Sequence, residues 1–278
     1  MTEPAAFWYD GSLFTGDTAE ATSVPLDSVG LRFGATVFTT LRVYHQDLDH
    51  PLTQWQGHCD RLRRSLERFD WPLPDWPAVR SGCQHLKAHF PILRVTLFPD
   101  GREWITGRSL PPQLAAQQQT GVRCWVAPSD YARSLPMHKT GNYLACYLAQ
   151  QQAQRHGADE AILTGAQGNW LETATGNLWG WAEGQWWTPT DSQCLPGLMR
   201  EQLIQTLTNG GQPPNGYVWT PERVEDFEAI AYSNCAVELL PVHTIFSGTT
   251  TLEYNPKHAS IQALQRQIAK ISSAEMGS

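Results

Sequence analysis

Residues 157–181 read GADEAILTGAQGNWLETATGNLWGW, and this stretch decides the class of fold. Its apolar runs AILT, WLE and LWGW are short and are separated by turns that contain glycine, which predicts short strands with tight connections. A helix is expected directly before them, over about residues 142–156, with Gly157 following its last turn. A helix followed by several strands predicts a domain of mixed α and β structure. The side chains expected to face the core from this helix are Tyr143, Leu144, Tyr147 and Leu148.

The N-terminal part of the chain predicts a second, smaller domain that also mixes helices and strands. Asp10-Gly11 and Asp100-Gly101 each separate two apolar runs, a pattern typical of β-hairpins. Residues 33–44, FGATVFTTLRVY, are rich in β-branched and aromatic residues and predict a strand. Hairpins around such a strand predict an antiparallel sheet.

Two helices and a linker complete the expected organisation. One helix is expected to be capped by Thr53, and the other to begin near Asp75. Residues 111–121, PPQLAAQQQTG, contain much Pro and Gln without apolar periodicity and are expected to be a linker. The chain would then consist of a small α+β domain over residues 1–110 and a larger domain over residues 122–278.

Composition and charge exclude several classes of protein. The 278 residues are 41% hydrophobic and 17% charged, an ordinary globular mixture, and a net charge of −7 argues against nucleic-acid binding. No apolar run is long enough to cross a membrane, and the N-terminus does not resemble a signal peptide. The six cysteines are scattered without a C-x-x-C pair, so we expect reduced thiols, a cytoplasmic protein and no metal site.

Three features together indicate a particular chemistry, although each alone has an ordinary explanation. Lys139, one of only four lysines, lies in MHKTGNY before a helix, and Glu172 lies at the end of a strand beside a small polar turn. An isolated lysine or glutamate is more often a solvated surface residue. The sequence LPGLMR at 195–200 places free backbone N–H groups at a helix start, where anions bind. Arg61 is either a phosphate ligand or a solvated arginine. An imine-forming lysine, a carboxylate for a pyridine nitrogen and an anion site are what pyridoxal phosphate needs.

The chain resembles the class IV aminotransferases, which are the pyridoxal-phosphate proteins of fold type IV. The motifs that carry the resemblance follow one another in family order between about residues 30 and 243. They are FGATVFTTLRVY, HCDRLRRS, HKTGNY, GADEAILTGAQGNWLETATGNLW, WWTP, LPGLMRE and SNCAVELLPV. The resemblance implies the two-domain fold of the D-amino-acid aminotransferase type, with the cofactor between the domains and a homodimer as the assembly.

The resemblance also implies roles for individual residues. Lys139 would bind pyridoxal 5′-phosphate covalently, and Glu172 would be the partner of its pyridine nitrogen. Arg61 and the backbone N–H groups of Leu198 and Met199 would hold the phosphate. The turn Asn234-Cys235 would lie near the phosphate and the substrate carboxylate.

Details of these motifs favour the lyase branch of the family. Branched-chain aminotransferases usually have Glu where this chain has Thr39, and Met199 replaces a Thr that is common in transaminases. We therefore expect 4-amino-4-deoxychorismate lyase activity, which converts the small molecule aminodeoxychorismate to 4-aminobenzoate and pyruvate for folate synthesis. Lys139 would be the catalytic base, and Thr39 either a catalytic hydroxyl near the leaving group or an ordinary strand residue.

Other hypotheses remain open at this level. An aminotransferase acting on branched-chain or D-amino acids is the enzymatic alternative. A binding protein is a second, because twelve tryptophans could form a carbohydrate platform. The sequence also leaves three arginines, Arg42, Arg94 and Arg102, as equal candidates for binding a substrate carboxylate.

Overall fold

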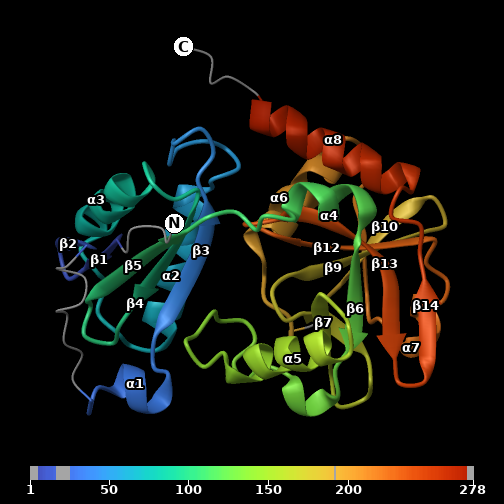
Figure 1. Ribbon diagram of the computed structural model, residues 1–278, viewed down its shortest axis with the longest axis horizontal. Helices are drawn as coiled ribbons and strands as arrows, with labels where there is room; N and C mark the ends of the chain where they lie inside the picture. The colour runs from blue at the N-terminus through green and yellow to red at the C-terminus, as the bar shows by residue number, and fades with distance from the viewer. Residues whose placement is uncertain (1–5, 17–25, 191, 274–278) are drawn as a thin grey trace. The chain divides into compact units, whose positions relative to one another are not determined.

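The computed structural model describes residues 6–16, 26–190 and 192–273 of the chain. Two compact units make up the chain (Figure 1), and each contains both helices and strands, as the sequence predicts. The first unit comprises Met1–Pro111 and also His138–Asn142, and the second comprises Pro112–Met137 and Tyr143–Glu275. The short segment that carries Lys139 therefore belongs to the first unit, although it lies far beyond the expected linker.

The first unit is an antiparallel sheet covered on one face by helices. Its strand order is β2-β1-β5-β4-β3. The core is formed by apolar side chains of this face together with residues of α2 and α3, such as Leu66 and Cys83. The strands are β1 (Ala6–Tyr9), β2 (Ser12–Thr15), β3 (Val37–Arg42), β4 (Ile92–Leu97) and β5 (Glu103–Arg108), and the helices are α1 (Val29–Phe33), α2 (Trp55–Arg68) and α3 (Trp76–Leu86).

Local sequence signals account for most turns and helix starts of this unit. Asp10 and Gly11 have φ angles of 48° and 75°, as a two-residue hairpin between β1 and β2 requires, so the predicted hairpin is confirmed. The Asp75 side chain accepts a hydrogen bond from the N–H of Ala78 and caps α3, as expected. The expected strand over residues 33–44 begins later, at Val37, because its first residue still belongs to α1.

The expected Thr53 cap of α2 is wrong. The residue before the helix is Gln54, with φ of 52°, and no side chain caps this end. The Thr53 hydroxyl instead donates to the Asp47 carbonyl at 2.9 Å and accepts from the N–H of Tyr44 at 3.2 Å. Because the hydroxyl is engaged by the preceding loop, it does not bond to the first turn of α2.

The second unit is built on a larger mixed sheet. Its strands lie in the order β11-β10-β9-β12-β13-β6-β7-β8, and β14 pairs with β13. The pairs β13–β6, β6–β7 and β10–β11 are parallel and the others are antiparallel. The strands are β6 (Val122–Val126), β7 (Glu160–Thr164), β8 (Trp170–Thr173), β9 (Asn177–Ala182), β10 (Gln185–Pro189), β11 (Asn215–Tyr217), β12 (Ala229–Asn234), β13 (Glu238–Ser247) and β14 (Thr250–Glu253). The helices are α4 (Leu114–Thr120), the 3-10 turn η2 (Ser129–Tyr131), α5 (Leu144–Arg155), α6 (Leu198–Asn209), α7 (Pro221–Val224) and α8 (Ala259–Ser273).

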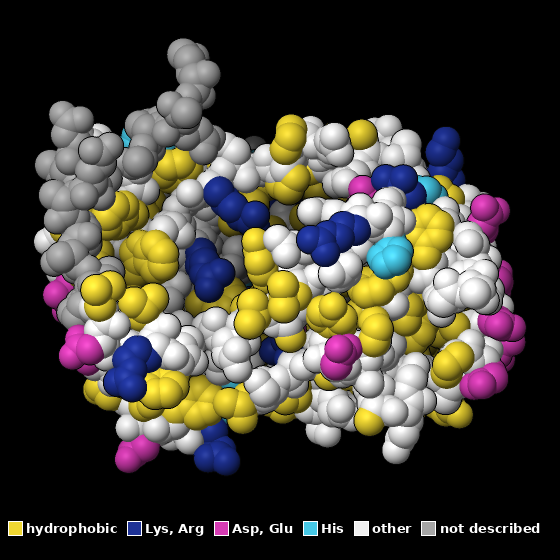
Figure 2. All heavy atoms as spheres, turned by 60° about the horizontal axis from the view of Figure 1, so that its bottom comes forward, with side chains coloured by type: hydrophobic (Ala, Val, Ile, Leu, Met, Phe, Trp, Pro, Cys, Tyr) yellow, Lys and Arg dark blue, Asp and Glu magenta, His cyan; other side chains and the backbone are white. Residues whose placement is uncertain are grey.

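Helix α5 buries a different face from the one predicted. Leu144 and Tyr147 are 62% and 59% exposed, and the helix packs through small side chains, Cys146, Ala149 and Ala153. Small residues allow the helix to lie close to β7, which the expected large side chains would prevent. Figure 2 brings one face of the molecule forward and shows apolar side chains, in yellow, exposed on it, so large apolar residues at the surface are not confined to α5. Gly157 ends the helix with φ of 73°, as predicted.

The stretch expected to be a linker contains a helix. Within residues 111–121, α4 buries Leu114, and the Gln118 side chain donates to the Val237 carbonyl at 3.2 Å. Gln265 of α8 donates in turn to the Gln118 carbonyl at 2.9 Å. These long-range polar contacts hold α4 on the second unit, and apolar periodicity does not reveal them. Among the described residues, no helix combines the length and the apolar character that crossing a membrane requires.

Candidate functional site

The segment with Lys139 is attached to the edge strand of the first unit. The N–H of Phe38 donates to the Lys139 carbonyl at 2.8 Å, and the N–H of Gly141 donates to the Thr36 carbonyl at 2.7 Å. The Lys139 Nζ atom lies 4.8 Å from the centre of the Phe38 ring, on the face of the sheet opposite α2. The backbone of β3 therefore fixes the backbone of Lys139 within this unit, and the Phe38 side chain of the same strand contacts its amine.

On the other face of β3, three polar side chains meet in the interior. Thr39, His58 and Arg61 are 1%, 1% and 5% exposed. Arg61 Nη2 donates to Thr39 Oγ1 at 2.5 Å, and the same oxygen lies 2.5 Å from His58 Nδ1. Burial lowers the pKa of His58 well below its usual value, and the positive charges of Arg61 and Lys139 lower it further. His58 is therefore neutral, and Arg61 is a buried cation rather than a solvated arginine.

The structure separates the three arginines that the sequence left equal. Arg102 is paired with Asp100 at 2.6 Å, and Arg42 stacks on the Tyr44 ring at 4.6 Å. The Arg94 guanidinium lies 3.6 Å from the centre of the Phe38 ring. Arg94 also lines a cavity of about 510 Å³ in the first unit, which the other two do not.

This cavity has mostly apolar walls. Among the described residues that line the cavity, Arg94 is the only charged one. Gly141, two residues after Lys139, also lines it. A cavity of this kind suits a molecule with an apolar body and one carboxylate. Its aromatic lining consists of Phe7, Tyr9, Phe98 and Trp104.

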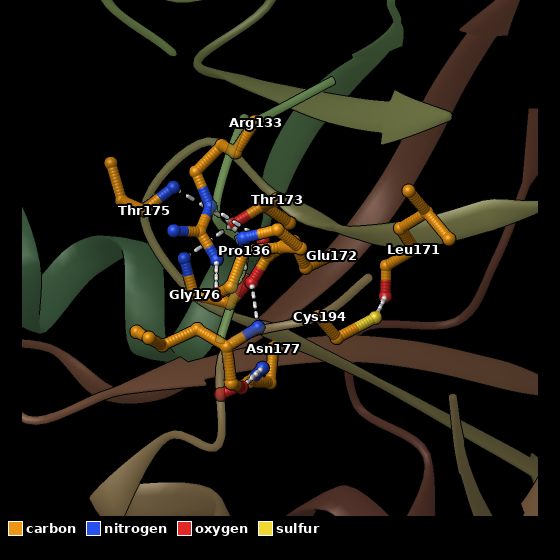
Figure 3. A network of polar contacts seen from close by, with 10 residues as sticks. Arg133, Pro136, Leu171, Glu172, Thr173, Thr175, Gly176, Asn177 and Cys194 are labelled. Carbon is orange, nitrogen blue, oxygen red and sulfur yellow. Dashed lines mark hydrogen bonds and ion pairs between the residues drawn. The ribbon is translucent and has the colours of Figure 1, made fainter. Parts of the chain in front are cut away.

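In the second unit, Glu172 forms a buried ion pair at the end of β8 (Figure 3). Arg133 Nε donates to Glu172 Oε1 at 2.8 Å, and the two side chains are 4% and 5% exposed. Glu172 Oε2 accepts from the N–H of Leu195 at 3.0 Å, and Arg133 Nη2 donates to the Pro136 carbonyl at 2.5 Å. Burial lowers the pKa of Arg133, but the charge and hydrogen bond of Glu172 outweigh this effect and raise it. Both charged groups are therefore held in one orientation.

The start of α6 leaves backbone N–H groups without a side-chain cap. Gly197 is the residue that precedes the helix. A Cβ atom at Gly197 would lie 2.0 Å from Asn177 Oδ1, so a larger residue would have to displace the Asn177 side chain. Asn177 also donates to the Leu195 carbonyl at 2.9 Å and holds the loop before the helix. The N–H groups of Leu198 and Met199 lie in the first turn, where N–H groups have no partner within the helix.

The turn after β12 is fixed by Asn234 itself. Asn234 Oδ1 accepts from the N–H groups of Ala236 and Val237 at 2.9 and 3.0 Å, and Cys235 is buried. Asn234 Nδ2 also lies 3.4 Å from the Thr175 hydroxyl. The turn is therefore connected to the loop that follows Glu172.

Glu160 is a buried carboxyl group that contacts this loop through Thr175. It accepts hydrogen bonds from Thr175 Oγ1, from Gln150 Nε2 at 2.7 Å and from the N–H of Ala161 at 2.9 Å. Burial raises its pKa to about 7, although these hydrogen bonds oppose the rise.

Arg133 and Glu160 are not among the site residues expected from the sequence. His58, near the proposed site residue Arg61, is expected to be a packing or hydrogen-bonding histidine, and its contact with Thr39 agrees with this. Arg133 pairs with a residue 39 positions away, so no local motif indicates the pair. His58 precedes Arg61 by three positions, which puts both on one helical face, and this spacing could have indicated their contact.

Comparisons with known proteins agree on one family. The model of the family Amino-transferase class IV matches residues 36–245. The branched-chain-amino-acid aminotransferase of Salmonella typhimurium is 24% identical over 264 residues, covering 86% of this chain and 84% of that protein. The structure of the Escherichia coli branched-chain amino acid aminotransferase superposes with a TM-score of 0.80 at 22% identity, covering 95% of this chain and 93% of the other. A structure provisionally assigned as a 4-amino-4-deoxychorismate lyase superposes with a TM-score of 0.73 at 25% identity. The match covers 89% of this chain and 94% of the other.

Proposed function

Because the chain belongs to the class IV aminotransferase family, whose cofactor is pyridoxal phosphate, we propose that it is an aminotransferase acting on branched-chain amino acids. The observation that carries this proposal is the similarity to branched-chain aminotransferases over 86% of the chain. The lyase was our first expectation from the sequence, and the aminotransferase was the alternative. These relatives favour the aminotransferase.

The residues of each unit fit the proposed cofactor. The buried Glu172 carboxylate accepts hydrogen bonds from Arg133 and from the N–H of Leu195, and a carboxylate held in this way suits a pyridine N–H. The α6 start, where no side chain caps the first-turn N–H groups, suits a phosphate. We assign Leu198, Met199 and Arg61 to the phosphate, and Lys139 to the covalent bond. Asn234 and Cys235 are assigned to the turn near the phosphate.

Within this proposal, the protein supplies the proton transfer and the charge. Pyridoxal phosphate, when bound, accepts the electron pair left after the substrate loses its α-proton. Lys139 Nζ takes that proton and returns it, and contact with the Phe38 ring holds the amine in place. Glu172, paired with Arg133 at 2.8 Å, would hold a proton at the pyridine nitrogen. A protonated nitrogen makes the ring a better electron acceptor.

The cavity of the first unit supports an apolar amino acid as substrate. Its aromatic walls suit a branched aliphatic side chain, and Arg94 suits one carboxylate. Aminodeoxychorismate has two carboxylates and would need a second cation. We therefore assign Arg94 to the substrate carboxylate.

The second candidate is the lyase. It is supported by the structure that is 25% identical and provisionally assigned to that activity, and by Thr39 in place of Glu. A catalytic role of Thr39 stays a prediction. The homodimer implied by the family resemblance is also a proposal, and sedimentation velocity of the purified protein tests it.

Parallel assays distinguish the two activities. Purified protein is incubated with pyridoxal phosphate, L-leucine or D-alanine, and 2-oxoglutarate, and glutamate is measured; a second reaction contains aminodeoxychorismate, and 4-aminobenzoate fluorescence is measured. We expect glutamate from L-leucine, its loss in Lys139→Ala, and its retention in Lys87→Ala, a lysine at the end of α3. Formation of 4-aminobenzoate without glutamate would overturn the aminotransferase in favour of the lyase.

A further inference from the structure

His58 is a buried side chain of α2 that the proposed function does not use. Its Nε2 atom has no hydrogen-bond partner in the described part of the chain. A buried N–H without a partner lowers the stability of the fold. An apolar side chain would avoid this cost, and the feature that it could not supply is the contact of the other nitrogen, Nδ1, with Thr39 Oγ1 at 2.5 Å.

The contacts around Nδ1 determine where the protons lie. A guanidinium only donates, so Thr39 Oγ1 accepts from Arg61. Arg61 Nη2 also lies 3.5 Å from His58 Nδ1, where a second N–H pointing at it would be unfavourable. Nδ1 therefore carries a lone pair, Thr39 donates its hydroxyl proton to Nδ1, and His58 is protonated at Nε2.

This arrangement orients the oxygen of Thr39 toward Arg61. A threonine hydroxyl rotates, and its proton could otherwise point at the guanidinium. With the proton held by His58 Nδ1 at 2.5 Å, the lone pairs face Arg61 Nη2. His58 and Arg61 are three residues apart on α2, so the helix itself keeps the imidazole and the guanidinium side by side.

We propose that His58 is a positioning residue, which acts through Thr39 to hold the Arg61 guanidinium in the orientation that binds a phosphate group. The inference rests on the phosphate role assigned to Arg61 under the proposed function. Arginine has a long, flexible stem, so a guanidinium that is already oriented loses less conformational freedom when it binds an anion. His58 thereby strengthens binding of a phosphorylated ligand without touching it.

The test compares the affinity of the apoprotein for pyridoxal phosphate with its affinity for pyridoxal, which lacks the phosphate. Titration followed by tryptophan fluorescence gives both dissociation constants, and their ratio isolates the contribution of the phosphate. Arg61→Leu should abolish most of the preference for the phosphorylated compound. His58→Leu should reduce it about tenfold, the effect of losing one hydrogen bond to a charged group.

Two further variants separate positioning from a structural role. His58→Asn places an amide oxygen near the position of Nδ1 and should restore most of the preference. Cys59→Ala alters a buried neighbour on the same helix and should leave the ratio unchanged. Thr39→Val removes the connecting hydroxyl and should match His58→Leu, and it provides the same measurement if His58→Leu does not fold.

The outcomes distinguish the inference from its premise. If Arg61→Leu leaves the ratio unchanged, the proposed phosphate role of Arg61 fails. If Arg61→Leu lowers the ratio while His58→Leu and Thr39→Val keep it at the wild-type value, the positioning role of His58 is overturned. The same conclusion follows if His58→Asn lowers the ratio as much as His58→Leu does.

Discussion

The buried pair Arg133–Glu172 makes a quantitative prediction about stability. Both side chains are at most 5% exposed, so Arg133→Leu leaves a carboxylate in the interior without its counter-charge. The N–H of Leu195, which donates at 3.0 Å, remains on Glu172 in that variant but carries no full positive charge. Removing one partner of a buried ion pair costs about 3–5 kcal/mol, whereas an exposed pair contributes less than about 1 kcal/mol. We expect Arg133→Leu to lower the free energy of unfolding by about 3–5 kcal/mol.

Urea denaturation of the apoprotein measures this loss, and a second variant identifies its cause. In Arg133→Leu/Glu172→Leu neither charge remains, so the double variant should be more stable than Arg133→Leu alone. Arg123→Leu is the matched control, because its pair with Asp159 is 47% and 33% exposed, and its cost should stay below about 1 kcal/mol. The reasoning would be refuted if Arg133→Leu lowered the free energy of unfolding by less than about 1 kcal/mol. It would also be refuted if the loss in the double variant equalled the sum of the losses in Arg133→Leu and Glu172→Leu.

Three further predictions follow from other contacts. Gly197→Ala should weaken pyridoxal phosphate binding at least about tenfold, because its Cβ would displace Asn177, and unchanged affinity in a titration would contradict the assigned phosphate site. Glu160 has a pKa raised to about 7, so the folded chain keeps a proton that the unfolded chain releases, and stability should fall by about 3 kcal/mol between pH 4.5 and 7. Unfolding measured across this range should show a shallower decline in Glu160→Gln; equal slopes would exclude Glu160 as the cause. Asp75→Ala should cost about 1 kcal/mol through loss of the bond to Ala78, seen as a lower melting temperature, and an unchanged melting temperature would count against the cap.

Signals that act within a few residues were predictable from the chain alone. Asp10-Gly11 prefers the positive φ angles of a tight hairpin whatever surrounds it, and the Asp75 carboxylate reaches an N–H three residues away. The ordered motifs likewise indicated the family that the comparisons then matched. Lys139 and Glu172 could be proposed because each lies in one of these motifs.

Contacts between distant segments were decided by the tertiary structure. The face of α5 that lies against β7 consists of small residues, and apolar periodicity alone favoured the larger ones that remain exposed. Arg133 meets Glu172 from 39 positions away, and Thr39 meets Arg61 from 22. Backbone torsion and helix capping depend on neighbours in the chain, so the sequence by itself determined the hairpins, the family and the candidate lysine. Burial and charge pairing depend on which surfaces pack together, so only the folded chain decided which arginine is a buried cation and which carboxylate it holds.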